Sequence, residues 1–392
     1  MTEPLPASYP TPQEERFLEL LLSENSDAVP LLWEEWKRAV PWDGITYATL
    51  QLLPLLYLRL TDAGITDPLM GKVEGLYRMA WVRNQLALRE TASVLSELRE
   101  RGIHPFLLKG SALFCTAYGT PGARFIEDVD LLVPYDRLLE TAGVLRASGW
   151  SCPVAQEEFA RVTGAHKEFE FTKGSVHIDL HANLFNVERY LPLATLLTKA
   201  DLRHPMGYDA LSEDARIVEV HGIPALVPSP EDMLIHLIVH GAPYNLHRPM
   251  RWVADALAVI AAGPIDWKRV CARTARFGFA ADMQRAFRYL RARFAPRGIP
   301  DAFYEELDAL PVTRGEARRF YARANGVAPL WGNLALVWYR YRTFTRASSL
   351  VPFLEFLRHN WQVPHLRDLP AHALGRVALR RARNRERLLR QQ

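Results

Sequence analysis

The 392-residue sequence predicts an α+β fold in which a small mixed β-sheet lies between two helical regions. Leucine and tryptophan recur at helical spacing up to about residue 95. Short apolar runs, typical of buried strands, then alternate with helical stretches, and helical patterns return beyond residue 190. We therefore predict an N-terminal helical region (1–95), an α/β core (96–190) and a C-terminal helical region (191–392).

Local signals predict the elements of the core. Apolar runs predict strands at 104–108 and 128–133, and helical periodicity predicts helices at 111–118 and 135–148. Two more strands, at 166–171 and 176–181, are separated by a Thr-Lys-Gly-Ser turn typical of a β-hairpin. Further on, Ser229 followed by Pro230 predicts the start of a helix.

Composition excludes several classes of protein. No apolar run approaches the ~20 residues that cross a bilayer, and the opening residues lack the features of a signal peptide. We therefore expect a cytoplasmic protein without a membrane partner. The net charge of +4 is too small to indicate nucleic-acid binding. The arginine-rich tail at 376–390 could be a solvated terminal helix, or it could contact nucleic acid or an acidic partner. The three cysteines match neither a disulfide framework nor a zinc site.

Two aspartates on the second core strand are the most informative residues of the chain. Asp128 and Asp130 stand at i and i+2, so both side chains project from the same face of a strand. Adjacent carboxylates repel each other unless a cation lies between them. Mg²⁺, which usually arrives with substrate phosphates, is the expected occupant.

A Gly-Ser turn comes before these aspartates. Gly110 and Ser111 follow an apolar strand and open a helix, where unpaired backbone N–H groups can bind phosphate. Lys109 and Arg124 flank the turn and could neutralise a triphosphate, although both could instead be surface charges. A phosphate-binding turn beside an Asp-x-Asp strand indicates chemistry on a nucleoside triphosphate.

The hairpin supplies a second group of titratable side chains. Alternation along its two strands places six of them on the polar faces, namely His166, Glu168, Glu170, His177, Asp179 and His181. If the apolar faces share one core, the polar faces share one side of the sheet. Asp179 could then join Asp128 and Asp130 as a third carboxylate. The alternative is an exposed amphipathic hairpin.

The run from 109 to 133 resembles a largely uncharacterised bacterial nucleotidyltransferase family of the DNA polymerase β superfamily. The resemblance rests on Lys-Gly-Ser-Ala-Leu at 109–113, Tyr-Gly at 118–119, Arg124 and Asp-Val-Asp-Leu-Leu-Val at 128–133. It continues with Asp-Leu-His at 179–181, Pro-Glu-Asp at 230–232, His240 and Arg-Trp-Val-Ala-Asp at 251–255. The spacing between Ser111 and Asp128 exceeds the shorter consensus of the superfamily, which leaves the roles of Lys109 and Arg124 open.

The resemblance implies a polymerase β-like core that transfers a nucleoside monophosphate from an NTP and releases pyrophosphate. It implies that Asp128 and Asp130 hold two Mg²⁺ ions with the bound NTP. Asp179 would ligate the catalytic metal and help to deprotonate the acceptor. The implied phosphate-binding residues are Gly110 and Ser111, and the charges of Lys109 and Arg124 make these two residues further candidates.

Further residues could support the site or contact the acceptor, namely His181, Glu170, His240 and Asp255. Asp255 also forms an i, i+4 pair with Arg251 that could simply support a helix. ATP is the expected donor because it is abundant. The acceptor could be a small molecule, a peptide, a protein or an RNA end, and the mild net charge favours the first two.

Two other functions fit parts of the sequence. The histidine-rich hairpin at 166–181 could form a transition-metal hydrolase site that holds Zn, Mn or Fe. A nucleotide-binding protein without catalytic activity could keep the same fold, although the intact aspartates argue against it. Separately, Asp232, His236 and His240 share one face of a predicted helix, where packing is favoured over metal binding.

Overall fold

The computed structural model describes residues 8–23, 25–155, 168–185, 205–243, 249–314, 316–317, 320, 338, 350–360, 363–375 and 378. His166 and almost all of the arginine-rich tail lie outside the described residues. Within the described residues, no helix combines the length and apolar character needed to cross a membrane.

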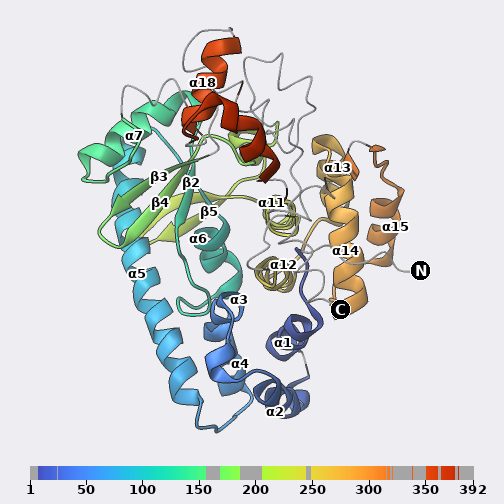
Figure 1. The fold of residues 1–392 in the computed structure, drawn as a ribbon. Coiled ribbons are helices and arrows are strands. Elements are labelled where there is room, and N and C mark those ends of the chain that lie inside the picture. Colours follow the sequence, from blue (N-terminus) through green and yellow to red (C-terminus); the bar gives the residue numbers. More distant parts are fainter. Residues whose placement is uncertain are drawn as a thin grey trace.

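One mixed sheet forms the centre of the described chain, with the strand order β3-β4-β2-β1-β6-β5 (Figure 1). Its strands are β1 (Phe106–Leu108), β2 (Val129–Leu132), β3 (Glu168–Lys173), β4 (Val176–His181), β5 (Arg216–Val220) and β6 (Ile223–Val227). β2 runs parallel to β4 and antiparallel to β1, and β1 runs parallel to β6. The predicted mixed sheet is thus confirmed, and it is larger than expected.

Two strands come from the region in which the sequence predicts only helices. β5 and β6 form a hairpin around His221 and Gly222, both of which have positive φ. β6 then pairs with β1, where Leu226 lies opposite Phe106. The sheet therefore extends beyond residue 190, because a distant hairpin covers the free edge of β1.

Helices before the sheet form the N-terminal part of the molecule. They are α1 (Pro12–Leu22), α2 (Val29–Ala39), α3 (Tyr47–Leu50), α4 (Leu53–Asp62) and α5 (Met70–Glu100), with short turns at Ser26–Ala28 and Trp42–Gly44. α5 is the long helix along one edge of the view in Figure 1. It packs against β4, β5, β6 and α7 (Leu138–Ala147). Arg146 of α7 lies over the ring of Phe171, so α5 and α7 cover the apolar face of the sheet.

The remaining helices lie within and after the sheet sequence. They are α6 (Lys109–Leu113), followed by a π-helical turn at Phe114–Tyr118, then α10 (Tyr208–Ser212), α11 (Pro230–Gly241), α12 (Arg251–Ala261), α13 (Trp267–Phe277), α14 (Ala280–Phe294), α15 (Asp301–Ala309) and α18 (Leu350–Asn360). Short 3₁₀ turns lie at Tyr135–Arg137 and Leu366–Asp368. Ser229 caps α11 by accepting the N–H of Asp232 over 3.2 Å, which confirms the predicted helix start.

A single hydrophobic core joins these parts. Its buried side chains run from Tyr9, which precedes α1, and Phe17 of α1, through the sheet, to Phe287 and Phe320. A smaller cluster around Phe353 belongs to α18. Burial of one continuous apolar core fixes the N-terminal helices, the sheet and the helices α11–α15 relative to one another.

Candidate active site

Strand pairing brings the predicted carboxylates together on one face of the sheet. In the parallel pair β2–β4, Asp130 lies opposite Asp179. In the antiparallel pair β3–β4, Glu170 lies opposite Asp179, and Glu168 lies opposite His181. The alternate residues of the hairpin are buried on the other face, namely Phe169, Phe171, Ile178 and Leu180. The expectation that the polar faces share one side is confirmed for the described residues.

Four of these side chains form a compact cluster. Oxygen atoms of Asp130, Glu168 and Asp179 and a ring nitrogen of His181 all lie within 4.8 Å of one another. Asp130 is only 1% exposed, and its Oδ1 lies 2.7 Å from His181 Nε2. The Lys109 ammonium donates to the same oxygen. Asp130 is therefore compensated by two basic side chains inside the fold.

The carboxylates of this face differ in how far nearby basic side chains compensate their negative charge. Burial alone would raise the pKa of Asp130, but Lys109 and His181 hold it well below its usual range. Burial, together with repulsion from Asp128 and Asp130, raises the pKa of Asp179 to about 7. Burial and Asp130 also raise the pKa of Asp128. Uncompensated carboxylates in this arrangement suit a divalent cation that prefers oxygen ligands.

The turn before α6 has a constrained backbone. Lys109 has a φ of 45°, in the left-handed region that residues with a Cβ rarely adopt. A Cβ at Gly110 would lie 2.2 Å from Arg124 Nη1, so any other residue there would have to displace the Arg124 guanidinium. Ser111 is fully buried, and its hydroxyl donates to the Leu108 carbonyl over 3.0 Å. The Lys109 side chain is 18% exposed and points inward to the carboxylates, which rules out a surface charge.

Arg124 is also buried, and Asp255 of α12 occupies its guanidinium. Nε and Nη2 donate to the two oxygens of Asp255 over 2.8 and 2.9 Å, and the Tyr118 hydroxyl donates to Oδ1 over 2.7 Å. Bidentate pairs of this kind fix the plane of the guanidinium. Arg124 therefore packs against Gly110 and ties the segment before β2 to α12. A role in phosphate binding remains a prediction.

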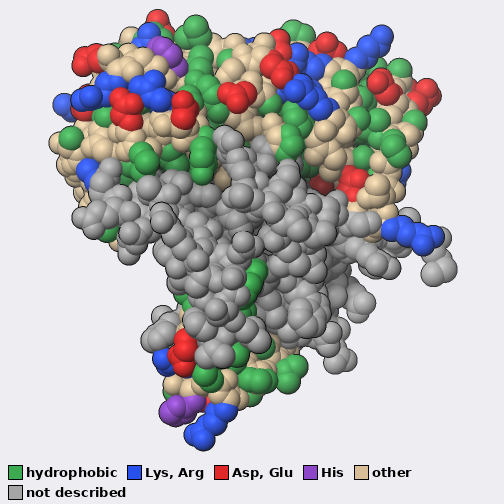
Figure 2. Space-filling view, turned by 90° about the horizontal axis from the view of Figure 1, so that it is seen from above, with side chains coloured by type: hydrophobic (Ala, Val, Ile, Leu, Met, Phe, Trp, Pro, Cys, Tyr) green, Lys and Arg blue, Asp and Glu red, His purple; other side chains and the backbone are tan. Residues whose placement is uncertain are grey.

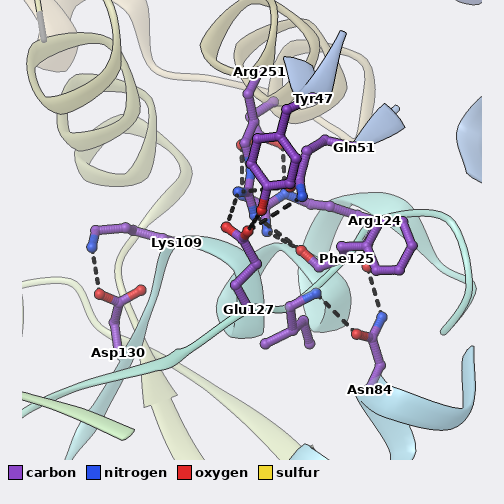
Figure 3. Close-up of polar contacts among 11 residues, drawn as sticks. Tyr47, Gln51, Asn84, Lys109, Arg124, Phe125, Glu127, Asp130 and Arg251 are labelled. Carbon is purple, nitrogen blue, oxygen red and sulfur yellow. Dashed lines mark hydrogen bonds and ion pairs between the residues drawn. The ribbon is translucent and has the colours of Figure 1, made fainter. Parts of the chain in front are cut away.

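Glu127 is the centre of a polar network that sequence reasoning missed (Figure 3). The Tyr47 hydroxyl and Gln51 Nε2 donate to Glu127 Oε1, the latter over 3.2 Å. From α12, Arg251 donates to Glu127 Oε2 over 2.9 Å. Arg251 and Asp255 thus have different partners on the segment before β2, so their role goes beyond the helix-supporting i, i+4 pair that the sequence also allowed.

Asn84 of α5 holds the same segment from another direction (Figure 3). Its amide nitrogen donates to the carbonyls of Pro121 and Arg124 over 2.5 and 2.7 Å. Its Oδ1 accepts the N–H of Ile126 over 2.9 Å. A fully buried asparagine inside a long helix needs such partners. A polar residue at a core position of the helical pattern is the sequence signal that could have revealed it.

A cleft of about 470 Å³ lies over the carboxylate face. The sheet side contributes Asp128, Asp179, Glu170 and His177, and the N-terminal helices contribute Tyr47, Leu50, Gln51, Met79 and Arg83. Phe125 and Glu127 complete the lining. His177 Nδ1 lies 2.9 Å from Glu170 Oε1. The cleft gives a ligand access to Asp128 and Asp179, and its lining does not include the turn at 109–111.

The other candidate group, on α11, has a structural role. Arg273 donates to both oxygens of Asp232 over 2.7 and 2.6 Å. The rings of His236 and His240 pack edge to face, with centroids 5.8 Å apart. The packing interpretation of this helix face is therefore supported, and His240 lies outside the carboxylate cluster.

A comparison with models of protein families matches residues 39–295 to a family described as Uncharacterised nucleotidyltransferase. The chain belongs to this nucleotidyltransferase family. Its membership indicates a transferase that uses an NTP. The matched range contains the whole cluster of carboxylates, the cleft and α12. Searches of curated proteins and of solved structures give no match.

Proposed function

We propose that this nucleotidyltransferase is Mg²⁺-dependent, transfers a nucleoside monophosphate from an NTP to an acceptor and releases pyrophosphate. The observation that carries the proposal is the strand register that sets Asp130 opposite Asp179, with Asp128 two residues before Asp130. This register fits the polymerase β-like core that the sequence motif implies. ATP is the expected donor.

The three aspartates would hold two Mg²⁺ ions together with the NTP. The donor set fits such ions, since Asp128 and Asp179 carry negative charge that Lys109 offsets only in part. When bound, the ions would stabilise charge on the attacking and leaving oxygens. The sheet fixes the backbone of the three aspartates, so their carboxylates would hold the Mg²⁺ ions in place.

The residues at 109–111 would bind the phosphates. Lys109 brings a positive charge next to Asp130, and the backbone N–H groups of the turn would bind a phosphate oxygen. Ser111 would contribute its N–H, because its hydroxyl is bonded to the Leu108 carbonyl. Arg124 would act mainly by fixing the position of Gly110.

Asp179 would accept the proton of the attacking hydroxyl group. This carboxylate lies opposite Asp130 on the neighbouring strand, close to the proposed metal ligands, so it can serve as a general base. The side chain lines the cleft, from which an acceptor can reach it. Glu170, opposite Asp179, and His181, hydrogen-bonded to Asp130, would support this geometry. Asp255 would act through Arg124.

The acceptor is proposed to be a small molecule or a peptide. On the face of the molecule shown in Figure 2, basic and acidic side chains of the described residues are interspersed. Such a surface gives no sign of the one-sided positive field that attracts nucleic acid. The mild net charge of +4 agrees with this choice.

A transition-metal hydrolase is the second candidate, and one observation favours it. His181 and Glu168 belong to the same compact group as Asp130 and Asp179, which gives a mixed nitrogen and oxygen ligand set. His177 instead contacts Glu170, and His166 lies outside the described residues. A hydrolase would contain Zn, Mn or Fe after purification and would act without any NTP.

Pyrophosphate release separates these functions. The wild-type protein is incubated with Mg²⁺, each of the four NTPs and a cell extract as the source of acceptor, beside Asp128→Asn, Asp130→Asn and the exposed control Glu219→Gln. Release in the wild type and in Glu219→Gln, but in neither aspartate variant, supports nucleotidyl transfer. Tight NTP binding without release would identify a non-catalytic binding protein.

A further inference from the structure

Arg83 places a positive charge on the helical wall of the cleft. The side chain lines the cleft together with Met79, one helical turn earlier on α5. Arg83 is exposed, and no acidic side chain of the described residues lies within ion-pair distance of it. The next residue, Asn84, is bonded to the segment that leads to Asp128. The backbone of Arg83 is therefore fixed relative to the carboxylates.

The other charged side chains that line the cleft and are not assigned to metal binding already have partners. Arg251 neutralises Glu127 across 2.9 Å. Glu170 lies 2.9 Å from His177. Among the described residues that line the cleft, and apart from the carboxylates assigned to metal binding, the guanidinium of Arg83 is then the charge that is available to a ligand.

The cleft lies on the side from which an acceptor should enter. The phosphates are assigned to the turn at 109–111, which follows β1, whereas the cleft is lined from β3, β4 and the residues before β2. Nucleotidyl transfer needs the attacking oxygen in line with, and opposite to, the leaving pyrophosphate. An acceptor in the cleft meets this requirement, because Asp179 opens into it.

We propose, on the basis of the nucleotidyl transfer proposed above, that the acceptor is a small hydroxyl compound with one anionic group that Arg83 binds. The anionic group is a carboxylate or a phosphate, since a guanidinium forms paired hydrogen bonds with either. The body of the acceptor packs against Met79 and Tyr47, and a cleft of about 470 Å³ holds a compound of this size.

The proposed transfer conserves atoms and electrons. The hydroxyl oxygen of the acceptor forms a bond to the α-phosphorus of the NTP, and its proton passes to Asp179. The bond from the α-phosphorus to the bridging oxygen breaks, and pyrophosphate leaves with the electron pair. Arg83 contacts a part of the acceptor that does not react, so it determines specificity rather than chemistry.

The test compares three matched probes, 4-(hydroxymethyl)benzoate, 4-(hydroxymethyl)phenyl phosphate and the uncharged 4-(hydroxymethyl)benzamide. Their dissociation constants are measured by NMR titration of the full chain with Mg²⁺ and an ATP analogue whose α,β-bridging oxygen is replaced by methylene, which prevents transfer. The variants are Arg83→Gln and the control Arg89→Gln, which changes an exposed arginine elsewhere on α5.

The wild type and Arg89→Gln are expected to bind at least one anionic probe roughly tenfold to a hundredfold more tightly than the amide. Arg83→Gln should lose this preference and bind the amide as before. The carboxylate and phosphate arms show which anion is preferred. Equal binding of all probes to the wild type, no binding of any probe, or a preference that survives in Arg83→Gln would overturn the proposal.

Pyrophosphate release is measured on the same preparations, so the two proposals can fail separately. Release that depends on Asp130, without any anion preference, would refute the acceptor assignment alone. An Arg83-dependent anion preference without release would leave the binding site in place and refute the proposed reaction.

Discussion

Replacing Asp179 and Asp130 by asparagine, one at a time, should change the stability of the metal-free protein in opposite directions. Asparagine has nearly the same shape as aspartate, so each change removes little except charge. Asp179 is repelled by Asp128 and by Asp130. Asp130 is held between Lys109 and His181. We expect Asp179→Asn to stabilise the fold and Asp130→Asn to destabilise it, although both should abolish transfer.

The size of each effect follows from the charges. The pKa of Asp179 rises from 3.8 to about 7, and one pKa unit corresponds to ~1.36 kcal/mol. The ionised form therefore costs the folded state at most about 4 kcal/mol, and screening by water in the cleft reduces this to roughly 2 kcal/mol. Asp130→Asn removes the carboxylate bonded to the Lys109 ammonium, which costs at most ~3–5 kcal/mol because Asp128 and Glu168 still attract Lys109.

The pH dependence gives the prediction a second check. Because the pKa of Asp179 is higher in the folded chain, its penalty begins near pH 4, grows as the pH rises and is complete above pH 7. The gain from Asp179→Asn should therefore be larger at pH 8 than at pH 5. The pKa of Asp130 is lowered, so its stabilising effect is already present at pH 5 and is lost only in stronger acid.

Urea unfolding in EDTA at pH 5 and pH 8 measures both effects, with Glu219→Gln as the exposed acid-to-amide control. The control should leave the free energy of unfolding within ~0.5 kcal/mol of the wild type. If Asp179→Asn destabilises the protein at pH 8 as much as Asp130→Asn does, the carboxylate face carries no excess charge. A divalent cation would then find no excess negative charge at this face.

Three further variants test the supports of the site. Gly110→Ala should cost ~1–3 kcal/mol in thermal unfolding, because the new Cβ would meet Arg124 Nη1 at 2.2 Å; unchanged unfolding would contradict this close packing. Asp255→Asn should cost ~3–5 kcal/mol in urea unfolding, since it leaves the buried Arg124 guanidinium without its counter-charge; adding Arg124→Met should recover part of the loss. Asn84→Leu removes the bonds to the segment before β2, so pyrophosphate release should fall at least tenfold, and normal release would show that the segment does not need this clamp.

The two faces of the hairpin could be predicted from the sequence because successive side chains alternate between the faces of a strand. The period of two in the hairpin correctly separates Phe169 and Phe171 from Glu168 and Glu170, and strand pairing then brings the acids to Asp179. The sequence also gives the start of α11, since a serine followed by proline caps a helix by short-range contacts.

Long-range contacts could not be predicted in this way. Pro224 interrupts the apolar run of β6, and β5 is largely exposed, so neither strand has a strong local pattern. His221 and Gly222 have positive φ because they form a two-residue turn. Gly222 is the residue that could have predicted this turn from the sequence. The partners of Arg251 lie on a segment more than 120 residues earlier in the chain, where no spacing rule applies.

Expression of residues 96–190 alone tests whether the predicted α/β core can fold without its neighbours. We expect this piece to remain unfolded, because the cut divides α5 and removes β6, which leaves β1 without one of its two strand partners. It also removes Asn84 and Arg251, which hold the segment before Asp128. Residues 8–314, which keep these contacts, should give a dispersed NMR spectrum and cooperative unfolding. Cooperative unfolding of 96–190 would instead mean that the carboxylate face folds without the helices that form the other wall of the cleft.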